Sequence, residues 1–465
     1  MKQSRVEVNA DAACPVCVPA CQRKLLLRWG SGMRILIPQY DCFAQCRFCE
    51  VIMLDEIVRH IARQRDRIID WQRAMTALPA LGPENGGQGE ADKAAYLSGV
   101  LRALGLAAET IHAPDDRVQS GSRPNLVARV PGRDPRTLWL LGHMDVVPPG
   151  DPALWRTDPW TATVDGDRIY GRGVEDNQQA IVCGLLVAQA LRALDATPDL
   201  TLGLMFAADE ETGNARGIKH LLTNRPDLFG KDDMLLAPDY GVNTGDQICV
   251  AEKSQLWLKI TVNGRQGHAA RPAMARNALV AAARMIVRTP EALGQAYPDT
   301  HSLFEAEPAS TFTPTRHEAN VPNVNTIPGR EVFYMDCRVL EGYDLDKVVD
   351  TARTALEATA QESGVEVGVE VVQANPAAPE ACVDSLLVRR LSRGIREIYQ
   401  VEPRPVGSGG GTVAGAARGM GLTAVAWARI MPTCHEPNEC SSIANTIGDA
   451  QVMATMLFAR SLPDA

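Results

Sequence analysis

Histidine and acidic residues follow short apolar runs at two places in this sequence. His143 comes after the run 138–141, and Glu210 and Glu211 close the stretch 202–211. Imidazole and carboxylate groups bind divalent ions such as zinc, cobalt and manganese. Two such ions about 4 Å apart can hold a water and a carbonyl group together and lower the pKa of that water towards about 7. These residue types therefore suit the hydrolysis of an unactivated amide bond.

Asp145 lies two residues after His143. Alternate residues of a strand point to the same side, so the Asp145 carboxylate can face His143 if the strand continues. A metal-bound imidazole usually needs a carboxylate or carbonyl on its other nitrogen. A single His-x-Asp pair is also a common structural feature, and it does not define a metal site by itself.

Asp176 follows a glycine turn and precedes the apolar stretch 180–191, which we expect to be a helix. It could cap this helix, or it could bridge two metals with one oxygen on each. Glu210 and Glu211 could form a solvated loop, or one could bind metal while the other takes a proton from a metal-bound water. Asp239 and His435 are individually ordinary turn and loop residues.

Taken together and in this order, the motifs resemble a known family from about Leu54 to the C-terminus. The family contains acetylornithine deacetylase, succinyl-diaminopimelate desuccinylase and glutamate carboxypeptidase, which are dimetal amide hydrolases. The segments that carry the resemblance are GHMDVVP at 142–148, GRGVED at 171–176 and DEETG at 209–213. The resemblance implies two divalent metal ions as cofactors, zinc in the first place, with cobalt or manganese as alternatives.

The resemblance also assigns roles to single residues. It implies five metal ligands, which are His143 and Asp239 at one ion, Glu211 and His435 at the other, and Asp176 between them. Asp145 would orient His143. Glu210 would be the general base that takes a proton from the bridging water and delivers it to the leaving nitrogen.

Further positions match the family's lid and substrate site. The segment GHAARP at 267–272 resembles the motif of a histidine that stabilises the oxyanion, often across a dimer interface, which implies this role for His268. The residues implied to hold the substrate's carboxylate and carbonyl are Asn325, Arg338, Gly411 and Thr412. Arginine suits bidentate carboxylate pairing, and glycine amides can form an anion nest. After Thr412 the chain reads Val-Ala where desuccinylases commonly have Ser-Asp, which argues against strict desuccinylase specificity.

Alternating apolar runs and helical stretches must position these residues. We expect strands at 138–141, 202–206 and 234–236, an arrangement typical of an α/β sheet whose ligands lie beyond the carboxyl ends of its strands. Between 256 and 372 the order strand, helix, strand, helix, strand predicts a ferredoxin-like α+β unit. A helix at 385–399 and a strand at 423–428 would return the chain to the first domain.

The predicted fold is α/β: a zinc-peptidase-like catalytic domain with a mixed sheet covered by helices, and an inserted ferredoxin-like lid and dimerisation domain. We expect a cysteine-rich extension at 1–52, a first catalytic part at 53–254, the lid at 255–373 and a second catalytic part at 374–465. The catalytic part would begin with a helix over 54–78.

Half of the twelve cysteines fall within the first fifty residues: Cys14, Cys17, Cys21, Cys42, Cys46 and Cys49. Their spacings are compatible with zinc or an iron–sulfur cluster. The alternative is a disordered or wrongly annotated extension, with Met53 as the true start. The scattered cysteines are expected to be small buried hydrophobes, and they are Cys183, Cys249, Cys337, Cys382, Cys434 and Cys440.

Composition excludes other classes of protein. The net charge is -9 with a pI near 5.5, and no basic block marks a nucleic-acid surface. No apolar run is long enough for a membrane span, and no signal peptide is apparent, so we expect a cytoplasmic protein.

We therefore predict an enzyme that hydrolyses the amide bond of an N-acyl amino acid, as a homodimer joined through the lid. The alternatives are a metallo-dipeptidase or carboxypeptidase acting on short peptides, and a non-catalytic metal-binding homologue.

Overall fold

The computed structural model describes residues 26–29, 33–36 and 42–458, with side chains from Ile52 to Phe458. The chain divides into two compact units, Met1–Glu56 and Ile57–Ala465. In the first unit, β1 (Leu26–Trp29) pairs antiparallel with β2 (Met33–Leu36), and α1 (Cys42–Ile61) begins. The side chains of the six N-terminal cysteines lie outside the described residues, so the metal site and the extension considered for them stay predictions.

The second unit is built on an eight-stranded mixed sheet with the order β17-β10-β18-β9-β5-β8-β4-β3. In this order the strands are Arg404–Ser408, Gln247–Glu252, Thr423–Ala428, Met234–Gly241, Asp134–His143, Leu200–Ala207, Ser122–Val130 and Ala108–Pro114. β5 lies between β8 and β9 and is parallel to both. The strands predicted at 138–141, 202–206 and 234–236 lie inside β5, β8 and β9. They could be predicted because parallel strands that are buried on both faces have a continuously apolar sequence.

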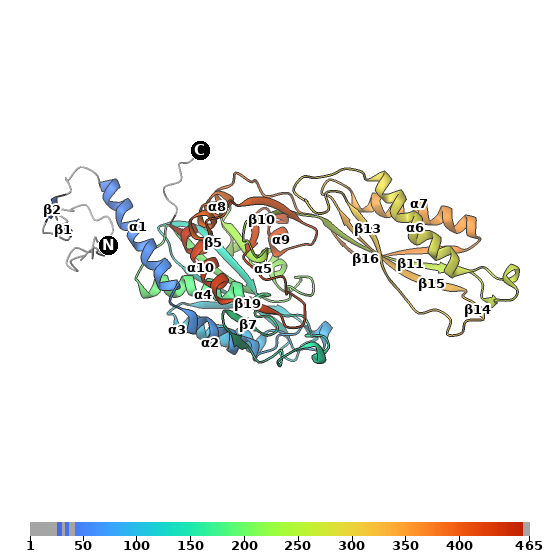
Figure 1. Cartoon of the computed structure of the whole chain (residues 1–465), viewed down its shortest axis with the longest axis horizontal. Coiled ribbons are helices and arrows are strands. Elements are labelled where there is room, and N and C mark those ends of the chain that lie inside the picture. Colours follow the sequence, from blue (N-terminus) through green and yellow to red (C-terminus); the bar gives the residue numbers. More distant parts are fainter. Residues whose placement is uncertain (1–25, 30–32, 37–41, 459–465) are drawn as a thin grey trace. The chain divides into compact units, whose positions relative to one another are not determined.

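Helices cover both faces of this sheet (Figure 1). Trp139 and Leu141 of β5 pack in one cluster with α5 (Ile218–Asn224) and α9 (Val413–Gly419). On the other side, α4 (Gln178–Ala193) contacts β5, and α10 (Ile443–Leu457) contacts α4, α8 (Leu386–Tyr399) and α2 (Arg65–Thr76). α3 (Ala91–Ala103) contacts β4. This layering matches the predicted α/β class, in which helices cover the sheet.

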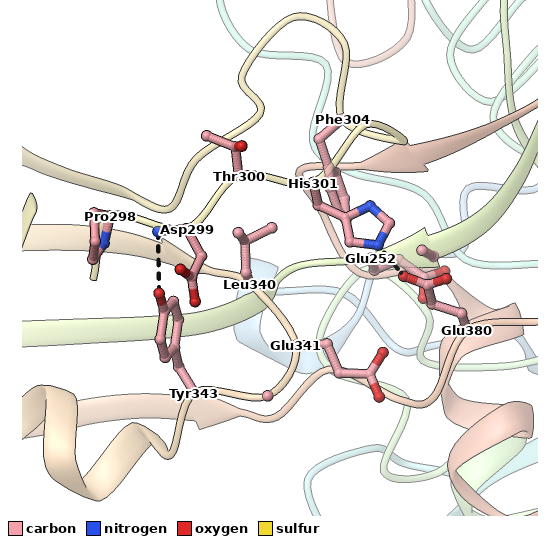
Figure 2. A pocket seen from close by; sticks show the side chains of 12 residues that line it. Glu252, Pro298, Asp299, Thr300, His301, Phe304, Leu340, Glu341, Tyr343 and Glu380 are labelled. Atoms are coloured by element: carbon pink, nitrogen blue, oxygen red, sulfur yellow. Dashed lines mark hydrogen bonds and ion pairs between the residues drawn. The ribbon is translucent and has the colours of Figure 1, made fainter.

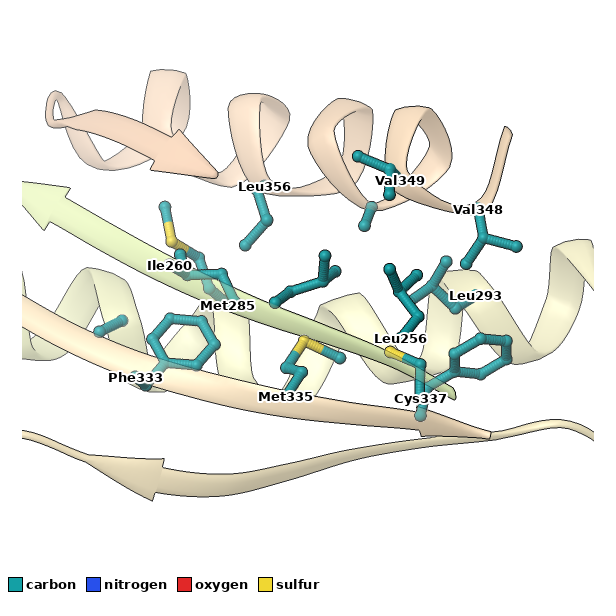
Figure 3. Close-up of a cluster of buried hydrophobic side chains, with 14 of the residues drawn as sticks. Leu256, Ile260, Met285, Leu293, Phe333, Met335, Cys337, Val348, Val349 and Leu356 are labelled. Atoms are coloured by element: carbon teal, nitrogen blue, oxygen red, sulfur yellow. The ribbon is translucent and has the colours of Figure 1, made fainter. Parts of the chain in front are cut away.

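A second, antiparallel sheet with the order β13-β15-β11-β16 forms what we call the four-stranded unit, residues 254–375. Its strands are Thr311–His317, Arg330–Val339, Ser254–Asn263 and Glu366–Asn375, and its helices are α6 (Ala278–Ala296) and α7 (Leu345–Ser363). Alternate residues Leu256, Leu258 and Ile260 of β11 pack against both helices (Figure 3). The edge strand β13 was not predicted, because its sequence TFTPTRH is polar and contains a proline.

One other sequence prediction is corrected, and two agree with the structure. The single helix expected over 54–78 is two helices, since α1 ends at Ile61 and α2 begins at Arg65. The predicted helix at 385–399 and strand at 423–428 agree with α8 and β18. Within the described part of the chain, no helix is long and apolar enough to cross a membrane.

Candidate active site

Three parallel neighbours of the large sheet bring three of the five predicted ligands to one edge. β5 ends at His143, which is paired in register with Ala207, the last residue of β8. Asp209 to Glu211 follow β8 directly, and Asp239 lies near the end of β9. Because the carboxyl ends of parallel strands share one edge of a sheet, residues distant in the sequence meet there.

His143 faces two carboxylates. Its Nε2 atom lies 2.9 Å from Oδ1 of Asp176 and 3.5 Å from Oδ1 of Asp239. The Asp239 oxygen also accepts a hydrogen bond of 2.8 Å from Nδ2 of Asn177, which follows Asp176. The ligand atoms of these three charged residues lie within 4.8 Å of one another, a spacing that a metal ion can bridge.

The Asp145 carboxylate joins the two loops of the site. Its two oxygens accept the backbone N–H groups of Glu210 and Glu211, each at 3.0 Å. Its Oδ1 also lies 3.4 Å from Nδ1 of His143. The same Nδ1 lies closer, at 3.0 Å, to the backbone carbonyl of Asp145. Asp145 thus contacts the imidazole through both groups and also binds the backbone of Glu210 and Glu211, and its orienting role stays a prediction.

His435 approaches Asp176 from the C-terminal part of the chain. Its Nε2 lies 3.2 Å from Oδ2 of Asp176 and 3.2 Å from Oε2 of Glu211. Asp176 therefore has one carboxylate oxygen towards each histidine. The short strand β19 (Cys440–Ser442) brings this segment into place by pairing antiparallel with β7 (Arg168–Tyr170).

A buried glutamate, which the sequence did not single out, secures the same region. Glu439 accepts hydrogen bonds from the backbone N–H groups of Gly173, Glu175 and Asp176 at 3.0, 3.0 and 3.1 Å. Arg172 Nη1 pairs with it at 2.7 Å. Glu439 thereby ties the turn that carries Asp176 to the segment that carries His435.

Cys434 is a second residue near the predicted ligands that the sequence did not single out. Its sulfur lies within 4.8 Å of ligand atoms of Asp176 and His435. It was expected to be buried, as was Cys382, but both are exposed, and only Cys183, Cys249, Cys337 and Cys440 of the scattered six are buried. Cys434 directly precedes a predicted ligand, and that position was the signal available in the sequence.

The electrostatics of the cluster reflect crowded acids. Burial, and then the neighbouring Asp239, raises the pKa of Glu210 well above its usual range. Burial and Asp176 raise the pKa of Glu211 to about 7. Burial lowers the pKa of His143, but its three carboxylate neighbours raise it by a larger amount, so the pKa lies well above its usual value. The two imidazoles and three carboxylates predicted as ligands form an N/O donor set that fits divalent ions, and such ions would relieve the repulsion between the acids.

Three of the predicted substrate residues lie where the four-stranded unit meets the glycine loop, residues 409–411. Arg338 Nη1 donates to the Gly409 carbonyl at 3.0 Å. The side-chain amide of Gln255 is oriented with its oxygen towards Arg338 and Gly411. This oxygen accepts hydrogen bonds from Arg338 Nη1 at 3.0 Å and from the Gly411 N–H at 2.9 Å. Thr412 Oγ1 donates to Glu252 at 2.5 Å. Arg338, Gly411 and Thr412 therefore form a second group, and no described hydrogen bond or ion pair joins it to the metal ligands.

His268 and Asn325 form a third group. The short strands β12 (Gly267–His268) and β14 (Thr326–Ile327) pair antiparallel, and the Ala269 N–H donates to the Asn325 carbonyl at 2.9 Å. β12 follows the end of β11, and β14 precedes the start of β15, which is paired with that end. β11 is a ten-residue strand and therefore spans on the order of 30 Å. His268 is exposed, and among the described residues its side chain bonds only the N–H of Ala270. The structure does not bring this predicted catalytic residue to the metal ligands.

A cavity of about 760 Å³ lies at the junction of the two sheets (Figure 2). His301 and Glu380 pair across its edge at 2.9 Å. Its lining includes Glu252 but none of the predicted metal ligands. This cavity is therefore separate from the acidic cluster.

Solved structures share this fold. Human carnosine dipeptidase 1 superposes with a TM-score of 0.70 at 17% identity, over 87% of this chain and 98% of that one. A metallo-carboxypeptidase of the M20 family from Sulfolobus solfataricus superposes with a TM-score of 0.65 at 19% identity, over 85% and 98%. At these identities the likeness concerns the fold, which is that of a class of peptidases.

The profile of peptidase family M20/M25/M40 matches residues 139–459, and the chain belongs to this family. An uncharacterized metallohydrolase of Methanocaldococcus jannaschii is 31% identical over 84% of this chain and 99% of its own length. A succinyl-diaminopimelate desuccinylase of Methylobacterium sp. (strain 4-46) is 32% identical over 67% and 77%. The protein is accordingly a hydrolase acting on amide bonds, in a family of divalent-metal enzymes, and the predicted resemblance is confirmed.

Proposed function

We propose that this enzyme hydrolyses the amide bond of an N-acyl amino acid. The likeness to a desuccinylase supports an acylated amino acid as substrate. Arg338 pairs in this structure with Asp336, through Nε at 2.6 Å and Nη2 at 3.0 Å, so it would bind the substrate's carboxylate only by giving up that ion pair. His143, Asp176, Asp239, Glu211 and His435 would hold two divalent ions, zinc by preference, with cobalt or manganese as alternatives. When bound, these ions would supply a polarised carbonyl and a water of lowered pKa.

One observation carries the mechanism. The Asp145 carboxylate holds the N–H groups of Glu210 and Glu211 side by side, so the general base is adjacent to a metal ligand. Glu210 Oε1 is 3.4 Å from Nδ2 of Asn214, and its side chain makes no ion pair among the described residues. Glu210 would take a proton from the attacking water and deliver it to the leaving nitrogen, which leaves the products as a carboxylate and a free amine.

The substitution Glu210→Gln tests this role. It keeps the shape of the side chain but removes the base, so kcat should fall at least about a hundredfold while bound metal, measured by elemental analysis, is retained. Glu357→Gln, on the exposed face of α7, is the matched control and should leave kcat unchanged. Unchanged turnover in Glu210→Gln would rule out the assignment.

The substrate class is tested by a panel of N-acetyl and N-succinyl amino acids and dipeptides on the zinc-loaded enzyme. N-acyl amino acids should release a free amino acid and an acyl acid. Hydrolysis of dipeptides alone would instead make the enzyme a dipeptidase, which was the alternative prediction.

We further propose that the four-stranded unit is the lid and joins two copies of the chain. The helix α6 and the turn before it expose the apolar side chains Met274, Leu279, Val280 and Val287. Adjacent exposed apolar groups of this kind suit a protein interface. Because His268 lies far along this unit, it could reach substrate only after a large rearrangement or from a second copy.

Val287→Asp should shift the chain from dimer to monomer in sedimentation velocity, because a charge would be buried in the interface. Met420→Asp changes an equally exposed apolar residue outside the four-stranded unit and should leave the mass unchanged. A wild-type monomer, or a dimer that survives Val287→Asp, would contradict this arrangement.

A further inference from the structure

The first turn of α3 contacts both loops that carry the proposed catalytic residues. Glu90 immediately precedes this helix and Lys93 lies in its first turn. Both side chains are fully buried, which is costly for ionised groups unless partners compensate. Both precede residues 139–459, where the family profile matches, and neither was singled out from the sequence.

Lys93 anchors the loop of the first metal ligand. Its Nζ atom donates to the backbone carbonyl of Met144 at 2.9 Å. Met144 stands between His143 and Asp145, so this hydrogen bond fixes the peptide that sets the direction of both side chains. Burial lowers the pKa of Lys93 to about 8, although the carboxylates of Asp145 and Glu90 oppose this effect.

Glu90 anchors the loop of the general base. Its Oε1 accepts the N–H of Asp209 at 3.2 Å, and its Oε2 accepts from Nε of Arg123 at 2.6 Å. Nη1 of the buried Arg123 also lies 3.5 Å from Oδ1 of Asp209. Asp209 has a φ of +59°, a left-handed conformation that a residue with a side chain rarely adopts without support.

We propose that this turn of α3 is a shared anchor for the site. Lys93 positions the loop of His143 and Asp145, and Glu90, together with Arg123, positions the loop of Glu210 and Glu211. These are positioning residues, since they act through the backbone of the neighbouring loops. The inference rests on the proposed function of the two loops, and a displacement of about 1 Å there can cost a hundredfold in rate.

Lys93→Met tests the first contact, because it keeps an unbranched buried side chain and removes the charge and the donor. Arg390→Met is the matched control, since Arg390 is also buried and donates to a backbone carbonyl, that of Met456 at 2.6 Å, on α8 away from the site. We expect both to lower the melting temperature. Per metal-loaded folded enzyme, kcat should fall at least about tenfold in Lys93→Met and less than about twofold in Arg390→Met, with KM little changed in both.

Amide hydrogen exchange provides a readout that needs no substrate. The N–H groups of Glu210 and Glu211, which donate to Asp145, should exchange faster in Lys93→Met and in the isosteric Glu90→Gln, while the strand β11 keeps its wild-type exchange. Should Lys93→Met fail to fold, Glu90→Gln carries the test. Wild-type exchange at these amides, or an equal loss of kcat in Arg390→Met, would overturn the anchor, whereas a wild type without turnover would refute only the proposed function.

Discussion

Asp176 illustrates how single residues build this site. It stands between two histidines. Burial raises the pKa of Asp176, but His143 and His435 lower it by a larger amount, so the pKa lies below its usual range. The hydrogen bonds to Asp176 and Glu211 raise the pKa of His435 to about 10. The two imidazoles thus pair directly with the carboxylates of Asp176 and Glu211, and these pairs keep the predicted ligand atoms close together.

Asp115 allows a test of acid stability away from the metal ligands. It is buried and pairs with Arg117 at 2.8 Å and with Arg216 at 2.9 Å. The hydrogen bond from Arg117 lowers its pKa from 3.8 to about 2. Because the folded pKa lies below the unfolded one, the carboxylate contributes stability above pH 4, and this contribution is lost as the pH falls towards 2.

Asp115→Asn should therefore lower the free energy of unfolding by about 2 kcal/mol at pH 7, and the difference from wild type should shrink between pH 4 and pH 2. Urea unfolding at a series of pH values measures this. Asp116→Asn, at the exposed neighbouring position, is the control. A difference that stays constant with pH would show that Asp115 acts through packing instead of charge.

At the scale of elements, buried strands were predictable and peripheral ones were not. β8 is buried along its entire length, so its sequence is continuously apolar. The edge strand β13 is mostly polar and exposed, and it forms because β15, which follows it in the chain, offers hydrogen-bonding groups along its edge. The break between α1 and α2 likewise depends on tertiary packing, since the apolar spacing of the sequence continues across it.

Leu258, at the centre of β11, tests the core of the four-stranded unit. It is fully buried among residues of α6 and α7. Leu258→Ala should lower the free energy of unfolding by about 2–5 kcal/mol, because it leaves a cavity between the sheet and the helices. Lys259→Ala, one residue along the same strand and partly exposed, should cost far less in the same urea titration. Equal losses in both variants would contradict the packing.

At the scale of the whole molecule, the second unit begins at Ile57 and contains every proposed site residue. A chain that begins at Met53 should therefore keep its melting temperature and its kcat within about twofold, and should bind the same amount of metal at the hydrolase site. Calorimetry, turnover and elemental analysis of the full and shortened chains measure this. Loss of activity on shortening would assign a role to the N-terminal cysteines.

The sequence by itself determined the family and the central strands, and it predicted the metal ligands, because these depend on motifs of a few adjacent residues. Tertiary structure decided which contacts connect the motifs. The Asp145 carboxylate binds the backbone of Glu210, Glu439 binds the backbone of Asp176, and Lys93 in the first turn of α3 binds the carbonyl of Met144. It also decided that His268 lies apart from the metal ligands. The physical reason is that a hydrogen bond between distant segments depends on how the strands are ordered in the sheet. The spacing of residues within one motif does not determine that order.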